Sequence, residues 1–140
     1  MFLLIYNTVI RLYAFGVRIA SFWNPKAKLW INGRNDILKH IRQTFNSNGK
    51  PVVWMHSSSL GEFEQGRFLL ENIKLKYPGT CIVITFFSPS GYQVSKNYKG
   101  ADYVYYLPLS TKQNARKFIG IIQPNLVLWI KYDYWYHYLV

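Results

Sequence analysis

The sequence predicts an α/β fold in which helices cover a parallel sheet. From Pro51 onward, four short apolar runs alternate with segments whose apolar residues recur at helical spacing. This alternation is typical of βαβ units, whose strands lie parallel in a Rossmann-like sheet. The expected strands are residues 52–55, 81–87, 103–107 and 126–130. Because each strand is a continuous apolar run, we expect all four to be buried on both faces of the sheet.

Helices are expected between the strands, at residues 62–77, 90–98 and 111–122. Pro78 and Gly79 mark the end of the first helix, and Ser110 and Thr111 can cap the start of the last one. A chain of 140 residues, half of them hydrophobic, is long enough for one domain with a core. We therefore expect a domain over residues 51–140, preceded by two further segments.

Residues 1–23 are almost wholly apolar or aromatic, interrupted only by Arg11 and Arg18. On an ideal helix these arginines fall within about 20° of each other and form one polar stripe. In a spanning helix, a central arginine costs roughly 2.5–3.5 kcal/mol on insertion scales. We therefore expect a membrane-anchoring helix that lies in the interface, with Trp23 near its end. The alternatives are a signal peptide, although no charge precedes the apolar region, and a hydrophobic helix packed on the domain.

Residues 24–50 form a basic connector. The net charge of the chain is +11, and its first 50 residues carry eight Lys and Arg against the single acid Asp36. Ile37, Ile41 and Phe45 follow helical spacing. The charge predicts an anionic partner, either phospholipid headgroups or nucleic acid, although a solvated helix face is the simpler explanation.

The loop at residues 56–62 is the first candidate site, because α/β sheets bind ligands where a strand ends and a helix begins. Ser59 and Glu62 fit the pattern S-x-x-E, a capping box in which both side chains satisfy N–H groups at the helix start. The alternative is that Glu62 acts as a general base on a hydroxyl nucleophile. Ser58 and Ser59 could then bind a ligand, and Gly61 would let it approach the backbone closely.

Two further segments follow strands at the same expected edge. Ser88, Ser90 and Gly91 could bind an anionic group, although turn chemistry also explains this loop. Residues 131–135 mix charged and aromatic side chains after the last strand, or they are only an exposed end. The three histidines lie far apart and the sole cysteine, Cys81, stands alone, so no metal site and no internal disulfide are expected.

Several stretches, taken in order, carry a resemblance to a known family. They read WMHSSSLGEFE at residues 54–64, ITFFSPSGY at 84–92, ADY at 101–103, LPL at 107–109 and NGR at 32–34. They resemble the N-terminal half of the Kdo transferases, the 3-deoxy-D-manno-octulosonic acid transferases that build the inner core of lipopolysaccharide.

The resemblance implies the N-terminal domain of a GT-B glycosyltransferase, in which two Rossmann-like domains face a cleft. It implies that Glu62 deprotonates a sugar hydroxyl of the lipid A precursor, which attacks Kdo as CMP leaves. CMP-Kdo is then the donor substrate, and no metal or other cofactor is expected. It also implies a location at the cytoplasmic face of the bacterial inner membrane, with the basic segments at an anionic lipid surface.

Two departures from the family limit this expectation. The second domain, which binds CMP-Kdo, has no counterpart in this sequence, so we expect an incomplete acceptor-side domain that is inactive alone. Tyr136 stands where the family tends to have proline and Lys131 where many members have a second acid, so no catalytic role is assigned there. The competing function is a truncated membrane-surface module without catalysis. A nucleic-acid binder would explain the charge, but no nucleic-acid motif is recognisable. Nucleic acid is therefore not expected as a partner.

Overall fold

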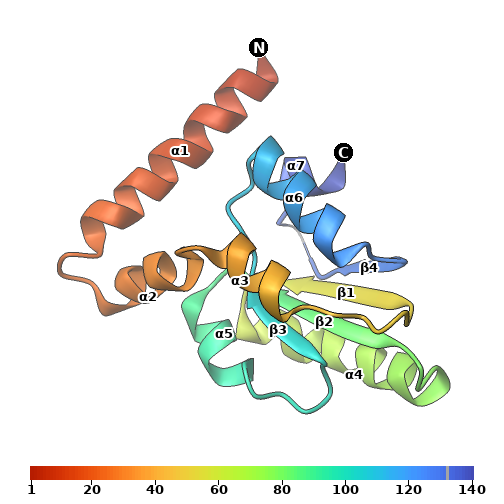
Figure 1. The fold of residues 1–140 in the computed structure, drawn as a ribbon. Coiled ribbons are helices and arrows are strands. Elements are labelled where there is room, and N and C mark those ends of the chain that lie inside the picture. The colour runs from red at the N-terminus through yellow and green to blue at the C-terminus, as the bar shows by residue number, and fades with distance from the viewer. Residues whose placement is uncertain (132) are drawn as a thin grey trace.

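The computed structural model describes residues 1–131 and 133–140. It shows a central sheet with helices on both faces and one long N-terminal helix that extends beyond the sheet (Figure 1). In chain order the elements are α1 (Phe2–Ala20), α2 (Pro25–Arg34), α3 (Ile37–Thr44), β1 (Val52–Ser57), α4 (Leu60–Lys76), β2 (Cys81–Phe86), α5 (Pro89–Ser95), β3 (Tyr103–Tyr106), α6 (Lys112–Ile122), β4 (Leu126–Trp129) and α7 (Tyr136–Leu139).

The four strands form one parallel sheet in the order β3-β2-β1-β4. Trp54 of β1 pairs with Val83 of β2 on one side and with Val127 of β4 on the other. This arrangement confirms the predicted Rossmann-like α/β class. The expectation that every strand is buried on both faces is wrong for the two edge strands. Leu126 and Val127 of β4 are 44% and 41% exposed, and the first two residues of β3 are only partly buried.

Two apolar layers hold the helices onto the sheet. On one face, Trp54 and Val83 pack with Phe118 of α6, Ile41 of α3 and Tyr138 of α7. On the other face, Met55 and Ile84 of the sheet pack with Phe63 and Leu70 of α4. The alternating side chains of β1 therefore serve both layers, which is why this central strand is buried along its whole length.

The helix starts follow the expected capping chemistry. Ser59, Ser88 and Thr111 each accept a hydrogen bond from a backbone N–H in the first turn of α4, α5 and α6. The basic connector contains two helices, and the chain breaks between them at Asp36, which has a left-handed φ of 50°. The short helix α7 has no counterpart among the predicted elements.

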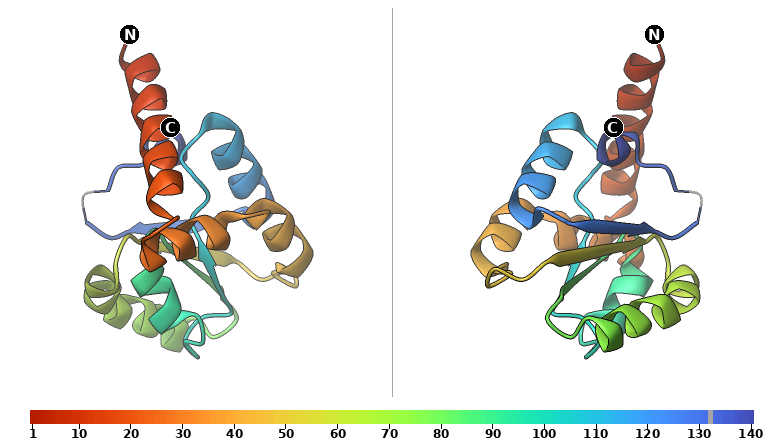
Figure 2. Two further views of the ribbon diagram at one scale, coloured as in Figure 1. Left: turned by 90° about the vertical axis from the view of Figure 1, so that its left-hand side faces the viewer. Right: turned by 90° about the vertical axis from the view of Figure 1, so that its right-hand side faces the viewer.

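Helix α1 contacts the domain along one face only. Ile10 is its one buried residue, and Tyr6 donates a hydrogen bond to Ser110 at 2.8 Å. The side chain of Asn7 lies 2.7 Å from His137 of α7. In two further views α1 stands beside α7 and rises above the sheet (Figure 2). By length and composition alone, this helix could cross a membrane.

Candidate functional site

The loop between β1 and α4 places Glu62 in the first turn of α4. The backbone N–H of Glu62 points to Ser59 Oγ at 3.4 Å, which is half of the predicted capping box. Its carboxylate accepts from the backbone N–H of Ser58 at 2.7 Å, one residue before the N-cap. Glu62 is partly exposed. Among the described residues, Oε1 has no hydrogen-bond partner, so capping and a second role for the carboxylate are compatible.

The loop between β2 and α5 lies beside the first loop, as the sequence predicts. The backbone N–H of Ser88 donates to the carbonyl of Ser58 at 2.8 Å. Ser88 Oγ accepts from the N–H of Gly91 at 3.1 Å and lies 3.5 Å from Ser90 Oγ. Of the predicted ligand-binding serines, Ser58 is buried, Ser59 and Ser88 are partly exposed and Ser90 is exposed. The structure therefore brings all four to one edge of the sheet.

The two glycines predicted to bind ligand differ in their surroundings. A Cβ on Gly91 would lie 2.6 Å from Phe86 Cδ1 and 3.2 Å from the backbone nitrogen of Leu60. Packing of the two loops therefore explains why glycine stands at residue 91. A Cβ on Gly61 would meet nothing within 4 Å, and the residue is exposed. Space for a ligand is thus found at Gly61, beside Glu62.

The segment after β4 returns to the same edge. Ile130 donates a backbone hydrogen bond to the carbonyl of His56 at 3.0 Å, and Trp129 Nε1 donates to the carbonyl of Asp133 at 2.6 Å. Trp135 stacks on Phe87, with ring centres 4.4 Å apart. Tyr132, within the predicted 131–135 segment, lies outside the described residues. The three loops at the carboxyl ends of β1, β2 and β4 therefore meet, as the predicted parallel sheet requires.

Arg34 joins α2 to this edge of the sheet. Its Nε donates to the carbonyl of Leu107 at 3.0 Å and its Nη2 to the carbonyl of Phe87 at 2.9 Å. Burial lowers the pKa of Arg34 to about 9, so the group remains charged at neutral pH. Its neighbour Gly33 touches the Tyr106 ring so closely that a Cβ would collide with it. From the sequence, Arg34 belongs to the basic connector and to the NGR stretch at residues 32–34, but its contacts are not predicted, because its partners lie 53 and 73 residues away.

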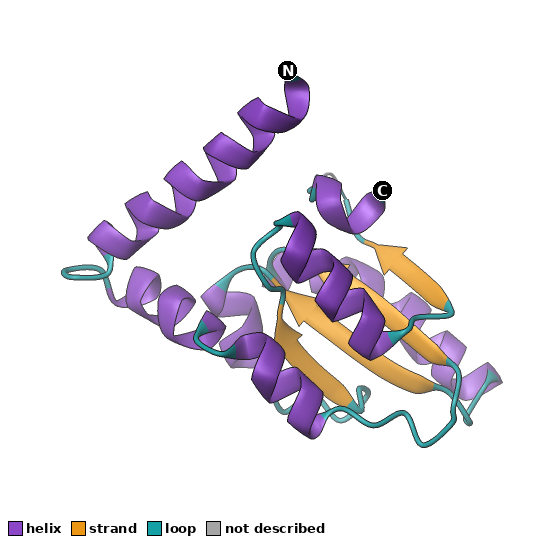
Figure 3. Cartoon of the chain, turned by 45° about the horizontal axis from the view of Figure 1, so that its top comes forward, coloured by secondary structure: helices purple, strands orange, loops and turns teal. Residues whose placement is uncertain are grey.

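A basic groove of about 630 Å³ opens between α1, α2 and α3. We call the cations that line it, Arg11, Arg18, Arg34 and Lys39, the groove cations. Asp36 is the only acid in its lining among the described residues, and apolar side chains such as Phe15 line it as well. In Figure 3 the strand arrows point toward the side where α1 and α2 lie, so the groove and the three loops share one side of the molecule. The structure therefore groups positive charge near the candidate site.

The predicted membrane residues are accessible. Arg11 and Arg18 are both exposed and face one groove, as their predicted single stripe requires. Trp23 is 73% exposed, just beyond the end of α1. The alternative of a hydrophobic helix packed on the domain is wrong for most of α1, because Ile10 is the one buried residue of this helix.

His56, near the end of β1, is the second ionisable side chain of the predicted loop at residues 56–62, and the sequence assigns it no role. It is fully buried, lies 2.9 Å from Thr85 Oγ1 through Nδ1, and packs 4.5 Å from the Trp129 ring. Burial lowers the pKa of His56 to about 3, which keeps the ring neutral. Within residues 1–131 and 133–140, no group of three or more His, Cys, Asp or Glu side chains could hold a metal ion.

Comparison with known proteins identifies one family. A family model of the glycosyltransferase N-terminal domain, described as 3-deoxy-D-manno-octulosonic-acid transferase (Kdo transferase), matches residues 34–140. A 3-deoxy-D-manno-octulosonic acid transferase of Haemophilus influenzae is 29% identical over 84 residues, covering 59% of this chain and 20% of the relative. The Rickettsia felis protein of the same name is 30% identical over 91 residues, covering 64% and 19%.

The Aquifex aeolicus protein of the same name is 26% identical over 89 residues, which are 63% of this chain and 24% of that protein. The chain therefore spans about a fifth to a quarter of the length of these relatives. The family match covers the sheet, the candidate loops and Arg34. This chain belongs to the Kdo transferase family and corresponds to its GT-B N-terminal domain.

Proposed function

We propose that this chain is the acceptor side of a Kdo transferase, with Glu62 as the general base. The observation that carries the proposal is the position of the Glu62 carboxylate, held by the Ser58 amide through one oxygen while the other has no partner among the described residues. Gly61 leaves open space beside it. A carboxylate fixed in this way is oriented to accept a proton.

In the proposed reaction, Glu62 accepts the proton of a sugar hydroxyl on the lipid A precursor. The hydroxyl oxygen forms a bond to the anomeric carbon of Kdo while the bond from that carbon to CMP breaks. The chain supplies the acceptor side. CMP-Kdo binds through a second domain, and the relatives are long enough to contain one. Ser58, Ser59, Ser88 and Ser90 surround the reacting group as hydrogen-bonding partners.

The groove cations and α1 would hold the same site at the membrane surface. A bisphosphorylated lipid acceptor offers phosphates to Arg11, Arg18 and Lys39, and its acyl chains remain in the bilayer beside the apolar face of α1. Tyr6 and Asn7 hold the N-terminal half of α1 against the domain, which favours an interfacial helix over a spanning one. The proposed location is the cytoplasmic face of the bacterial inner membrane.

The test is Kdo transfer from CMP-Kdo to a lipid A precursor, using this chain joined to the second domain of a relative. We expect Glu62→Gln to lower kcat roughly 100-fold or more, the range that general base catalysis contributes. The matched control is Glu64→Gln, two residues along the same helix, whose carboxylate pairs with Arg67 at 3.2 Å on the exposed side. Equal activity of Glu62→Gln and the parent, with both folded, would show that Glu62 is only a cap.

The second candidate is a membrane-binding module without catalysis, favoured by the exposed apolar face of α1. In that case the joined protein binds anionic vesicles and neither it nor its variants transfer Kdo. Binding to anionic vesicles is compared with binding to single-stranded DNA across a salt series. Because the basic surface is combined with an apolar helix, we expect vesicle binding to persist at high salt and DNA binding to be absent or to vanish there.

A further inference from the structure

A chain of buried side chains reaches from the core of the sheet to Glu62. Trp54 Nε1 lies 2.8 Å from Thr85 Oγ1, and Thr85 Oγ1 lies 2.9 Å from His56 Nδ1. On the other side of the ring, His56 Nε2 lies 3.4 Å from Ser58 Oγ. Trp54, His56 and Thr85 are at most 1% exposed, so their polar atoms must satisfy one another.

The indole at one end fixes the direction of these hydrogen bonds. An indole N–H can only donate, so Thr85 Oγ1 accepts from Trp54. The single proton of the Thr85 hydroxyl then has one acceptor among the described residues, which is His56 Nδ1. A neutral imidazole that accepts at Nδ1 carries its proton on Nε2. His56 therefore donates from Nε2 toward Ser58 Oγ.

Ser58 connects His56 to Glu62 through two hydrogen bonds. Its hydroxyl oxygen faces His56, and its backbone N–H donates to Glu62 Oε2 at 2.7 Å. Its backbone carbonyl accepts from the N–H of Ser88, so the neighbouring loop holds the same residue. With its oxygen facing His56, the hydroxyl proton of Ser58 is free to donate to an oxygen of a bound sugar or phosphate.

We infer that His56 is a positioning residue for Glu62: as the Nε2-protonated ring, it orients Ser58, whose amide holds the Glu62 carboxylate. This inference rests on the proposed function, because it gives His56 a role only if the orientation of Glu62 matters for transfer. A ring that only satisfied Thr85 in the core would not need its Nε2 to face Ser58.

The tautomer is measured on this chain by long-range ¹H–¹⁵N correlation NMR, with His56→Gln used to assign the signals. We expect His56 to show an unprotonated Nδ1 and a protonated Nε2. A protonated Nδ1 would overturn the inference. This measurement needs no substrate and no second domain, so it does not depend on whether the protein transfers Kdo.

The role in catalysis is measured in the chain joined to a second domain. His56→Met removes the donor toward Ser58, whereas His56→Gln keeps a side-chain N–H on that side. We expect the Met variant to lower kcat roughly 10- to 100-fold, as misplaced groups do, with the KM for the acceptor nearly unchanged. We expect the Gln variant to recover most of kcat even if its thermal stability is no higher than that of the Met variant.

If kcat falls in proportion to the loss of thermal stability in both His56→Met and His56→Gln, the histidine has only a structural role and the inference is overturned. Glu62→Gln is assayed in parallel. If it is inactive while His56→Met keeps full kcat, the positioning role is wrong and the proposed function stands. If Glu62→Gln is fully active, the proposed function is wrong, and so is the role of His56 in catalysis. The NMR measurement still shows whether the hydrogen-bond chain from Trp54 to Ser58 has the inferred direction.

Discussion

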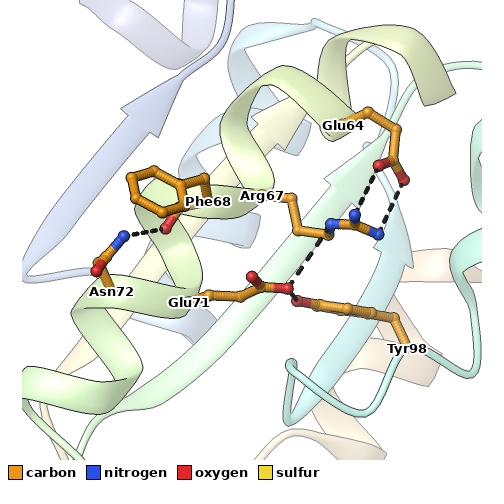
Figure 4. Close-up of polar contacts among 6 residues, drawn as sticks. All are labelled: Glu64, Arg67, Phe68, Glu71, Asn72 and Tyr98. Atoms are coloured by element: carbon orange, nitrogen blue, oxygen red, sulfur yellow. Dashed lines mark hydrogen bonds and ion pairs between the residues drawn. The ribbon is translucent and has the colours of Figure 1, made fainter.

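Helices α1 and α4 both turn one face to the domain, but their outer faces suit different surroundings. On α4, Arg67 lies 3.2 Å from Glu64 and 3.7 Å from Glu71, and Tyr98 donates to Glu71 at 2.9 Å (Figure 4). Phe68, Leu69 and Leu75 are exposed on this helix too, but they stand beside polar side chains, and Asn72 donates to the carbonyl of Phe68. Arg67 and Lys74 of α4 are therefore each paired with an acidic side chain, as on a surface that faces water.

The outer face of α1 carries large apolar side chains instead. Its exposed aliphatic residues are Leu3, Leu4, Ile5, Val9, Leu12 and Ile19. Arg11 and Arg18 are its charged side chains, and neither forms an ion pair with the described residues. An apolar helix flanked by unpaired cations matches a bilayer interface with anionic headgroups. The difference indicates that the α1 side of the molecule, and not the α4 side, faces the membrane.

The largest expected effect distinguishes the apolar face of α1 from Phe68, an exposed apolar residue of α4. We expect the double variant Leu4→Ser/Leu12→Ser to weaken partitioning into anionic vesicles by more than about 100-fold, because burying each leucine contributes roughly 1.5–3 kcal/mol. Phe68→Ser on α4 is the matched control and should leave partitioning unchanged. Vesicle flotation measures both, and a similar loss in the two variants would break the comparison.

The next effect is the loss of folding stability when Arg34 or Arg67 is replaced. Arg34→Met leaves the carbonyls of Leu107 and Phe87 without their donor, so we expect unfolding to become about 2 kcal/mol easier. Arg67→Met removes only exposed ion pairs and should cost less than about 1 kcal/mol. Urea denaturation monitored by circular dichroism checks both values. A greater cost at Arg67 than at Arg34 would contradict the structural role given to α2.

The comparison extends to two histidines, His56 in the sheet and His137 beneath α1. Folding lowers the pKa of His56 from 6.5 to about 3, so the unfolded chain binds more protons between these values. The stability that neutral His56 allows is therefore present above pH 6.5 and is lost as the pH falls toward 3. We expect a loss of about 1 kcal/mol between roughly pH 7 and 5.5.

The measurement is thermal denaturation across that range of pH. His56→Gln should flatten the pH dependence. The pKa of His137 is also lowered by burial, but His137 is partly exposed, so His137→Gln should flatten the dependence less. A steeper dependence in His56→Gln than in the parent would be inconsistent with a buried neutral ring.

The smallest effect concerns single cations. Arg11→Gln and Arg18→Gln should each weaken binding to anionic vesicles by about fivefold, since a cation near an anionic leaflet contributes about 1 kcal/mol. Arg67→Gln, which removes a paired cation on α4, should change binding less. Raising the salt concentration should erase the differences. Equal effects of all three variants would mean that net charge alone, and not its placement on α1, decides binding.

The sequence predicts the sheet well because local periodicity decides it. The apolar runs at residues 52–55 and 81–87 can be recognised without knowing any distant contact. The same holds for the capping pattern of Ser59 and Glu62. What the pattern leaves open is which amide the Glu62 carboxylate binds, since Ser58 and Ser59 are both within reach of a helix start. The break at Asp36 was missed because a left-handed residue there leaves no hydrophobic signal.

The roles of Arg34 and His56 could not be predicted, because both depend on contacts across the fold. Arg34 binds carbonyls that the strand order brings to one edge, and His56 depends on Thr85 in the neighbouring strand. Exposure of Leu126 and Val127 likewise follows from the place of β4 at the sheet edge, which apolar composition does not reveal.

The most direct test of the membrane-facing side is spin-label accessibility on vesicles of anionic phospholipid. Single cysteines are placed in turn along residues 2–20 of α1 and at Phe68 of α4, after Cys81→Ala removes the native thiol. We expect oxygen accessibility that oscillates with a helical period along α1, highest at Ile5, Leu12 and Ile19, which lie seven residues apart on the face away from Ile10. A label at Phe68 should instead be reached by a water-soluble nickel reagent. Uniformly high oxygen accessibility through α1 would reveal a spanning helix, and labels on α1 that are reached only from water would show that this side of the molecule does not face the membrane.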